Sequence, residues 1–272
     1  MTLKQNLHTH SVFCDGNDTI EEIIISAIDK GFSSIGFSSH SYVEDATYHT
    51  LTPDTLKDYK REICALKQKY ADKIKVYCGI EQDIESPVDS DGFDFTIGAV
   101  HTLKLGGKLY DVDWTAEKTK DIINNFFSGD GLKYAKVYYE RLAQLPKYGD
   151  FDILAHFDLI AKFNEITPLF DEESDEYKSA VLETVRALAG KIPYFEVNTG
   201  AISRGYRKTP YPSPFIIKEL KKSGFGAVVT TDCHNKDFLD CGMRDADRLL
   251  RECGFREKFI LSDNGFKAVP LV

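Results

Sequence analysis

The sequence lacks the features that mark membrane, secreted and zinc-ribbon proteins. None of its six cysteines forms a Cys-x-x-Cys pair, which argues against a closed structural zinc site. No apolar run approaches the roughly 18 residues of a membrane-spanning helix. The first residues carry no apolar segment typical of a secretion signal. We therefore expect a cytoplasmic protein with reduced thiols and no membrane partner.

Positive charge is also scarce. The net charge is -9, and the acidic residues are dispersed along the chain rather than gathered in one run. A protein that tracks the phosphates of a nucleic acid usually needs a basic face, so we expect no nucleic-acid partner. An anionic small molecule remains compatible with this charge, because bound divalent cations reverse the local charge of a site.

Short apolar runs alternate with amphipathic helical patterns along the chain. Helices are expected between Thr19 and Gly31, from Thr52 to Tyr70, and over 173–189 and 244–253. The runs expected to form strands are 5–7, 34–37, 75–80, 95–100, 152–154, 194–197 and 226–229. This alternation predicts βαβ units, and seven or eight of them fill the length as one α/β barrel. No linker-like segment divides the chain, so residues 1–272 are expected to form a single domain.

Six of the seven histidines follow a predicted strand, usually with a carboxylate nearby. Side chains at positions i and i+2 of a strand point to the same side, so His8 should converge with His10, and Asp232 with His234. In a parallel barrel the carboxyl ends of all strands open onto one face. The groups expected to meet there are His8, His10, Asp15, His40, Glu81, His101, His156, Asp232 and His234.

This mixture of donors indicates a metal centre. Imidazole nitrogen combined with carboxylate oxygen suits zinc, manganese or iron better than magnesium or calcium, which prefer oxygen ligands. Nine groups are more than one tetrahedral or octahedral ion can use. We therefore expect two or three divalent transition metals.

The same residues resemble the polymerase and histidinol phosphatase (PHP) family. The motifs are His8-x-His10 with Asp15, His40 after Phe-Ser-Ser, Glu81 followed by His101, and Asp232-x-His234. The triplets Gly79-Ile80-Glu81 and Asn198-Thr199-Gly200 are similar to the histidinol-phosphatase branch. The resemblance implies a distorted, TIM-like (β/α)7 barrel with a trinuclear metal site at the carboxyl ends of the strands.

The resemblance also implies an allocation of ligands to three metals. One metal is held by His8, His10, Glu81 and Asp232; Glu81 bridges to a second metal held with His101 and His156; and Asp15, His40 and His234 hold the third. Some relatives have a histidine where this chain has Asp15. The carboxylate is an equally good ligand but can change which metal prefers that position.

Such a site suits the hydrolysis of a phosphate monoester, which is very slow without a catalyst. Two close metals can share a hydroxide and direct it at phosphorus, and further positive charge stabilises the phosphoryl oxygens. The expected reaction converts L-histidinol phosphate and water into L-histidinol and phosphate, as in histidine biosynthesis, without a phosphoenzyme. The residues expected to carry it are Glu81, His101, Asp232 and Arg204.

Cations and acids in loops are candidates for substrate contacts. Arg204 is the preferred phosphate clamp, because arginine grips phosphate through two parallel hydrogen bonds, and Arg207 and Lys162 are further candidates. The ammonium and imidazole of histidinol need carboxylates or aromatic rings. The loop after His101 offers Asp111, Asp113 and Trp114.

Other readings of the metal site remain open. The substrate could be another phosphomonoester, a nucleotide or a phosphotyrosyl protein. An amidohydrolase-type enzyme also uses His-x-His on a barrel strand, but usually needs a bridging lysine where this chain has Glu81. A module that only binds metal would gain nothing from Arg204. If the strands are regular, Cys14 and Cys233 point away from the metals, and we assign them no role.

Overall fold

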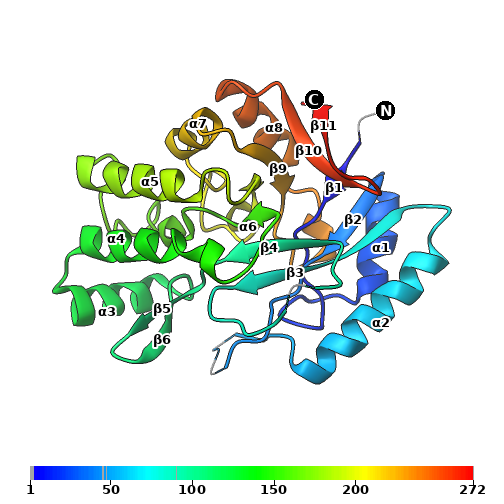
Figure 1. The fold of residues 1–272 in the computed structure, drawn as a ribbon, viewed down its shortest axis with the longest axis horizontal. Coiled ribbons are helices and arrows are strands. Elements are labelled where there is room, and N and C mark those ends of the chain that lie inside the picture. The colour runs from blue at the N-terminus through cyan, green and yellow to red at the C-terminus, as the bar shows by residue number, and fades with distance from the viewer. Residues whose placement is uncertain (1–2, 45, 47, 90, 272) are drawn as a thin grey trace.

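Seven parallel strands form the central sheet of the computed structural model, which describes residues 3–44, 46, 48–89 and 91–271 (Figure 1). Their order is β1-β2-β3-β4-β7-β8-β9. The strands are β1 (Gln5–Asn6), β2 (Ser34–Phe37), β3 (Lys75–Asp83), β4 (Phe95–Ala99), β7 (Ile153–Leu154), β8 (Tyr194–Asn198) and β9 (Gly226–Thr230). Each corresponds to one of the seven apolar runs, so the predicted strands are confirmed.

The first and last strands of the sheet approach each other and nearly close it into a barrel. Just beyond β1 and β9, Thr9 and Cys233 form a parallel bridge. The amide of Cys233 donates to the carbonyl of His8 over 3.1 Å, and the amide of His10 donates to the carbonyl of Cys233 over 2.9 Å. The predicted (β/α)7 barrel is therefore confirmed, and its seam runs between two candidate metal-binding segments.

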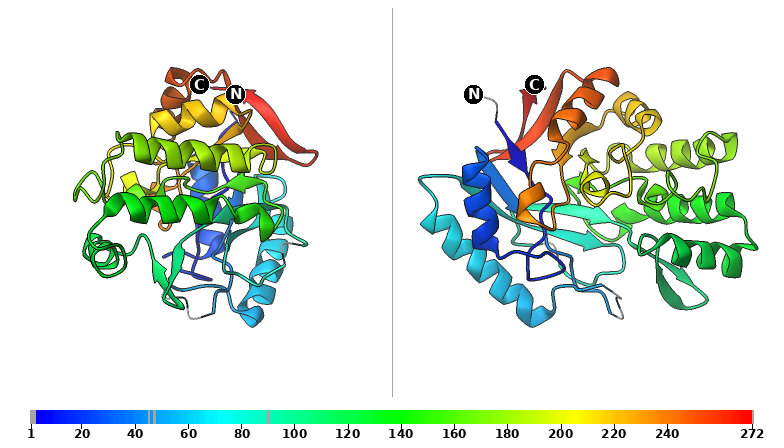
Figure 2. Two further views of the ribbon diagram at one scale, coloured as in Figure 1. Left: turned by 60° about the vertical axis from the view of Figure 1, so that its left-hand side comes forward. Right: turned by 180° about the vertical axis from the view of Figure 1, so that it is seen from behind.

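Helices cover the outside of the barrel (Figures 1 and 2). They are α1 (Ile20–Asp29), α2 (Pro53–Lys69), α3 (Ala116–Phe127), α4 (Gly131–Leu142), α5 (Asp175–Leu188), α6 (Gly200–Ser203), α7 (Pro214–Lys222) and α8 (Met243–Glu252), with short 3-10 turns at Leu145–Lys147, Leu159–Ala161 and Lys236–Phe238. The four predicted helices are α1, α2, α5 and α8. Helix α1 starts with the expected capping box between Thr19 and Glu22. Among the described residues, no helix is both long and apolar enough to cross a membrane.

The connections between β3 and β7 distort the regular alternation. The described residues between β3 and β4 contain no helix. After β4, the chain forms an antiparallel hairpin of β5 (Thr102–Leu105) and β6 (Lys108–Asp111) before α3 and α4. The hairpin projects from one side of the barrel in Figure 1. Its second strand returns the chain to the end of β4, where Asp111 pairs with Thr102 and the amide of Val112 donates to the carbonyl of His101 over 2.9 Å.

A second hairpin, β10 (Glu257–Ser262) with β11 (Gly265–Pro270), covers the end of the barrel where β1 begins (Figure 2). The side-chain amide of Gln5 donates to the carbonyl of Leu261 and accepts from its amide, over 2.9 and 2.7 Å. Leu261 belongs to a small buried apolar cluster that also contains Leu7, Tyr77, Phe95, Ile97, Ala99, Ile153, Ala155 and Val228. The hairpin therefore closes the barrel at the end opposite the strand carboxyl termini.

The Phe95 ring packs directly over two strand glycines. A Cβ at Gly79 would lie 2.3 to 2.6 Å from atoms of this ring, and a Cβ at Gly36 would lie 2.8 Å from it. Tyr77, Gly79 and Glu81 are every second residue of β3, so these three positions face the same side of the strand. The ring thus fills the space below Glu81 only because position 79 has no side chain.

We predict that Gly79→Ala destabilises the protein by about 1–3 kcal/mol, because the added methyl group overpacks the Phe95 ring. Urea unfolding of the metal-free protein measures the loss. Adding Phe95→Leu to Gly79→Ala should cost less than the sum of the two single changes, since the smaller side chain relieves the overlap. Additive losses would show that the ring does not require a glycine at position 79.

Candidate metal centre

The structure brings the nine predicted side chains together at the carboxyl ends of the strands. Glu81 lies within β3, and the remaining groups follow β1, β2, β4, β7 and β9. Asp232 and His234 converge although the chain that carries them is not a regular strand. Strand β9 ends at Thr230, and Asp232 has a φ of +46°, in the left-handed region that non-glycine residues rarely occupy. A tight turn, rather than strand alternation, therefore places Asp232 Oδ1 3.5 Å from His234 Nδ1.

Glu81 is the centre of the cluster and is only 1% exposed. Five imidazoles surround its carboxylate: Oε2 lies 2.8 Å from His40 Nδ1, 3.3 Å from His8 Nε2 and 3.5 Å from His10 Nε2, and Oε1 lies 3.1 Å from His156 Nε2 and 3.2 Å from His101 Nε2. Burial alone would raise the pKa of Glu81, but the neighbouring histidines lower it well below its usual range. The carboxylate is therefore ionised and shared among five imidazoles that follow four strands, β1, β2, β4 and β7.

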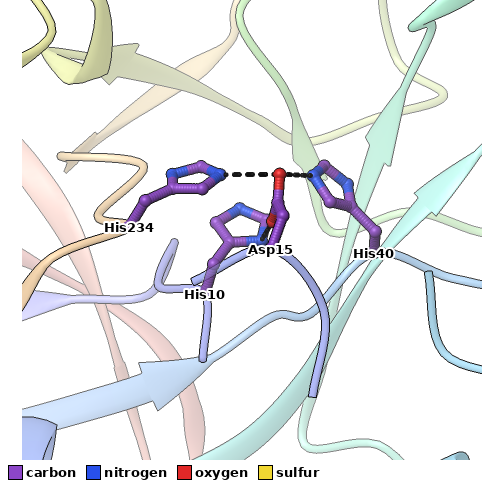
Figure 3. A group of neighbouring side chains, drawn as sticks. All are labelled: His10, Asp15, His40 and His234. Carbon is purple, nitrogen blue, oxygen red and sulfur yellow. Dashed lines mark ion pairs between the residues drawn. The ribbon is translucent and has the colours of Figure 1, made fainter. Parts of the chain in front are cut away.

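The side chain of Asp15 is 34% exposed and lies between the imidazoles of His234 and His40 (Figure 3). Its Oδ2 lies between two imidazoles, 3.2 Å from His234 Nε2 and 3.6 Å from His40 Nε2. Its Oδ1 lies 3.6 Å from His10 Nδ1. The rings of His10 and His234 stack with their centroids 4.2 Å apart.

Asp232 connects the cluster to a cation. Its Oδ1 lies 3.1 Å from His10 Nε2, whereas its Oδ2 accepts a hydrogen bond from Arg204 Nη2 over 2.9 Å. Burial alone would raise the pKa of Asp232, but Arg204 and His8 lower it well below its usual range. The two oxygens therefore have separate partners, one inside the cluster and one at its edge.

The buried donors fit divalent metal ions. The Nε2 atoms of His8 and His10 and the Oε2 atom of Glu81 are buried without a hydrogen-bond partner, and unpaired buried polar atoms are rare in proteins. Potential ligand atoms lie within 4.8 Å of one another in three groups: His10, Asp15, His40 and His234; His8, His10 and Asp232; and His40, Glu81 and His101. Such nitrogen and oxygen donors suit transition metals.

These three groups overlap with the ligand sets implied by the resemblance but do not match them. His10 and His40 each belong to two groups, whereas the resemblance gives each of them to a single metal. His156 belongs to none of the three, although its Nε2 lies 3.1 Å from Glu81 Oε1. Glu81 joins His101 as expected.

Two buried carboxylates behind the histidines were not found from the sequence. Glu196, within β8, lies 2.9 Å from His8 Nδ1. Asp83, at the end of β3, accepts from the amide of His101 over 2.9 Å and lies 3.2 Å from its Nδ1. The available signal for Glu196 was a charged residue in the middle of a strand, between Phe195 and Val197. In each case the carboxylate contacts the ring nitrogen opposite the one that faces Glu81.

Cys14 is closer to the cluster than expected. Its Sγ lies 3.3 Å from His10 Nδ1, because β1 ends at Asn6 and the following turn brings Cys14 back beneath that ring. Burial raises the pKa of the Cys14 thiol, so the sulfur stays neutral. The expectation that Cys14 points away from the metals assumed a regular strand, a condition that is not met because β1 ends at Asn6. Cys233 instead donates from its thiol to the carbonyl of Asn235.

A cleft of about 390 Å³ opens above the cluster. It is lined by Asp15, His40, Glu81, His101, His156, Asp232 and His234 at its base, and by Tyr48, Asp111, Asp113, Trp114, Lys162, Arg204 and Tyr206 on its walls. Lys162 Nζ donates to the Asp113 carboxylate over 2.8 Å and to its carbonyl over 2.7 Å. Three candidates for substrate contacts, Arg204, Lys162 and Asp113, therefore line the cleft. Tyr48 and Tyr206 were not predicted.

Arg207 lies elsewhere. Its guanidinium is buried, with Cζ 4.7 Å from the centre of the Tyr211 ring, and Nη1 donates to the carbonyl of Ala161. The carboxylates of Asp158 and Glu165 lie 3.9 and 3.6 Å from it. These contacts hold Arg207 behind the wall of the cleft, and the structure does not place it where a substrate could contact it.

The model of the PHP domain matches residues 6–200 of this sequence. The chain belongs to the PHP domain family. It is 25% identical over 264 residues to a probable histidinol-phosphatase of Deinococcus radiodurans, covering 92% of this chain and 93% of that protein. It is 25% identical over 256 residues to a histidinol-phosphatase of Bacillus subtilis, covering 85% of this chain and 93% of that protein.

The fold of this PHP chain also matches a solved structure. Histidinol phosphate phosphatase from Lactococcus lactis, in complex with zinc, L-histidinol and phosphate, aligns with a TM-score of 0.74 at 22% identity. The alignment covers 97% of this chain and 98% of that one. The fold is therefore shared over nearly the whole length.

We predict that metal binding to the metal-free protein releases protons near pH 7. Burial alone would lower the pKa of His101, but Glu81 and Asp83 raise it to about 10. The pKa values of His8 and His40 are likewise raised well above their usual value, because nearby carboxylates outweigh burial. A metal must displace these protons, so its apparent affinity should fall as the pH falls below the raised values.

Calorimetric zinc titrations in buffers of different ionisation enthalpy measure the number of protons released. The count should shrink as the starting pH approaches 10, where His101 loses its proton without metal. Zinc binding at pH 7 with no proton release would contradict the assignment of raised pKa values to these imidazoles.

Proposed function

We propose that this protein is a metal-dependent histidinol-phosphatase, which hydrolyses L-histidinol phosphate to L-histidinol and phosphate. The observation that carries the proposal is the Glu81-centred cluster, which opens into a cleft whose wall holds Arg204. Relatives named histidinol-phosphatase align with 85% and 92% of the chain, which favours this substrate over other phosphomonoesters.

Two or three divalent metals would occupy the cluster. We propose His8, His10, Asp15, His40, Glu81, His101, His156, Asp232 and His234 as their ligands. Zinc is supported by its presence in the Lactococcus structure, and manganese or iron would suit the same donors. When bound, these ions supply Lewis acidity, which lowers the pKa of water and offsets the charge of the phosphoryl group.

The protein's own residues position the ester. Arg204 is held by Asp232, and its remaining positive charge faces the cleft, where it would orient the phosphoryl oxygens. Lys162 adds a second cation on the wall. The base of the cleft is buried, and low-dielectric surroundings strengthen these interactions relative to water.

The wall of the cleft also contains groups that suit a cationic leaving group. Asp111, Asp113 and the half-exposed ring of Trp114 line it. Carboxylates pair with ammonium and imidazolium groups, and aromatic faces attract cations. Asp113 is held in place by Lys162, so its orientation is fixed before substrate binds. Histidinol carries both an ammonium and an imidazole, which matches this wall.

We further propose that residues 1–272 act as one domain in the cytoplasm. Strands from both ends of the chain contribute to the same barrel, and the last hairpin is bonded to Gln5 at its start. All six cysteines are free thiols, which agrees with a reducing compartment. The cleft fits a small molecule.

We predict selective turnover of histidinol phosphate. Protein purified with zinc or manganese should contain two or three metals per chain by elemental analysis. It should release phosphate from histidinol phosphate faster than from nucleotides, phosphotyrosyl peptides or sugar phosphates. Faster hydrolysis of another phosphate ester would show that the protein is a phosphoesterase with a different substrate. Amide hydrolysis without phosphate release would show that it is not a phosphoesterase. Bound metal without any turnover would indicate a binding module.

We predict different consequences for the two neighbouring arginines. Arg204→Ala should lower kcat/KM by about 10²-fold, because a cation that stabilises developing charge is lost, while the metal content is retained through Asp232 Oδ1. Arg207→Ala is the matched control: it should lower the melting temperature, because Asp158 and Glu165 lose their buried partner, and leave kcat/KM nearly unchanged. Equal kinetics for wild type and Arg204→Ala would exclude the clamp.

A further inference from the structure

Glu196, on β8, is a buried carboxylate behind the histidines of the site and is 1% exposed. It is saturated by four hydrogen-bond partners. Its Oε2 lies 2.9 Å from His8 Nδ1 and 2.8 Å from Thr230 Oγ1, and its Oε1 lies 2.8 Å from the amide nitrogen of His156 and 2.7 Å from Asn198 Nδ2. Both oxygens thus accept two donors each.

This arrangement fixes the tautomer of His8. An ionised carboxylate can only accept hydrogen bonds, so the His8 nitrogen that contacts it must be Nδ1–H. When a metal displaces the second proton of the ring, the remaining proton stays on Nδ1 and Nε2 carries a lone pair. Nε2 is buried without a hydrogen-bond partner and lies 3.3 Å from Glu81 Oε2 and 3.7 Å from Asp232 Oδ1. The lone pair therefore points at the candidate metal position.

Glu196 also joins two strand ends. The same carboxylate that holds the His8 ring, which follows β1, holds the backbone amide of His156, which follows β7. Thr230 and Asn198 come from β9 and β8, so the contacts span four strands of the barrel. A carboxylate that served only in a structural ion pair would need a single cationic partner. Glu196 instead holds both the His8 ring and the His156 backbone, two of the groups that surround Glu81.

We propose that Glu196 is a positioning residue that sets the tautomer, orientation and basicity of His8 as a metal ligand, and places His156 beside it. A carboxylate behind a ligating histidine raises the basicity of the imidazole, and its loss typically weakens metal affinity by about 10–100-fold. The inference rests on the proposed metal site and does not depend on which phosphate ester is the substrate.

The test is Glu196→Gln, which keeps the size of the side chain but loses the charge. Zinc affinity and stoichiometry are measured by competition with a chelator. The variant should bind one zinc about 10–100-fold more weakly while retaining the others, because the contacts of Asp15 with His40 and His234 do not involve Glu196. Glu196→Asp, which keeps the charge, should recover part of the lost affinity.

The matched control is Asp247→Asn. Asp247 is also a buried carboxylate, but it pairs with Lys258 over 2.7 Å, between α8 and β10 and away from the cluster. Its loss should lower the melting temperature of the metal-free protein without changing zinc affinity. A Glu196→Gln variant that behaves in this way, destabilised but with unchanged zinc affinity, would overturn the proposal.

A second measurement does not depend on the folding of any variant. Nitrogen-15 NMR of the wild-type zinc protein distinguishes the two imidazole tautomers, and His8 should carry its proton on Nδ1, with Nε2 unprotonated. A His8 that is protonated on Nε2 would overturn the proposal. If the zinc results hold but histidinol phosphate is not hydrolysed, only the proposed substrate fails. If wild-type protein binds no zinc, the metal site and this inference both fail.

Discussion

One ionised carboxylate, buried among five imidazoles, is the interaction on which the site depends. A charge as deeply buried as that of Glu81 is costly unless it is paired and hydrogen-bonded. In the metal-free protein, protons on the surrounding imidazoles provide that compensation, which is why the pKa of Glu81 falls while those of His8 and His40 rise. Metal ions can replace those protons, because they also supply the positive charge that compensates the Glu81 carboxylate. The cluster is thus stable in two forms that exchange protons for metals.

The barrel makes this concentration of charge possible. The groups around Glu81 are fixed at strand ends, and the seam between Thr9 and Cys233 locks the segments of His8, His10 and Asp232 against one another. Below the cluster, the Phe95 ring and the β10–β11 hairpin fill the barrel and exclude water. The charged groups therefore act in a dry environment, where each contact is stronger than it would be in water.

The sequence was sufficient to predict the strands and the residues that meet above them, because apolar runs and the histidines that follow them are local patterns. It was insufficient where the answer depends on tertiary position. Arg204 and Arg207 occupy the same loop, yet only Arg204 lines the cleft, since buried acids hold Arg207 behind it. Glu196 looks like an ordinary polar strand residue until the fold brings His8 beside it. Asp232 was predicted correctly, although a left-handed turn, not strand alternation, directs it.

In the proposed function, Asp232 would link the binding of metal to the binding of phosphate without competition between them. Its Oδ1 faces the imidazole of His10, whereas its Oδ2 and its carbonyl hold Arg204. If Asp232 helped to hold a metal through Oδ1, the hydrogen bond from Arg204 to Oδ2 could persist and keep the guanidinium oriented toward the cleft. Withdrawal of electron density from the carboxylate by that metal would weaken its hold on Arg204 and leave more of the guanidinium charge for the phosphoryl group. The cation would then be most available to the ester when the metal site is filled.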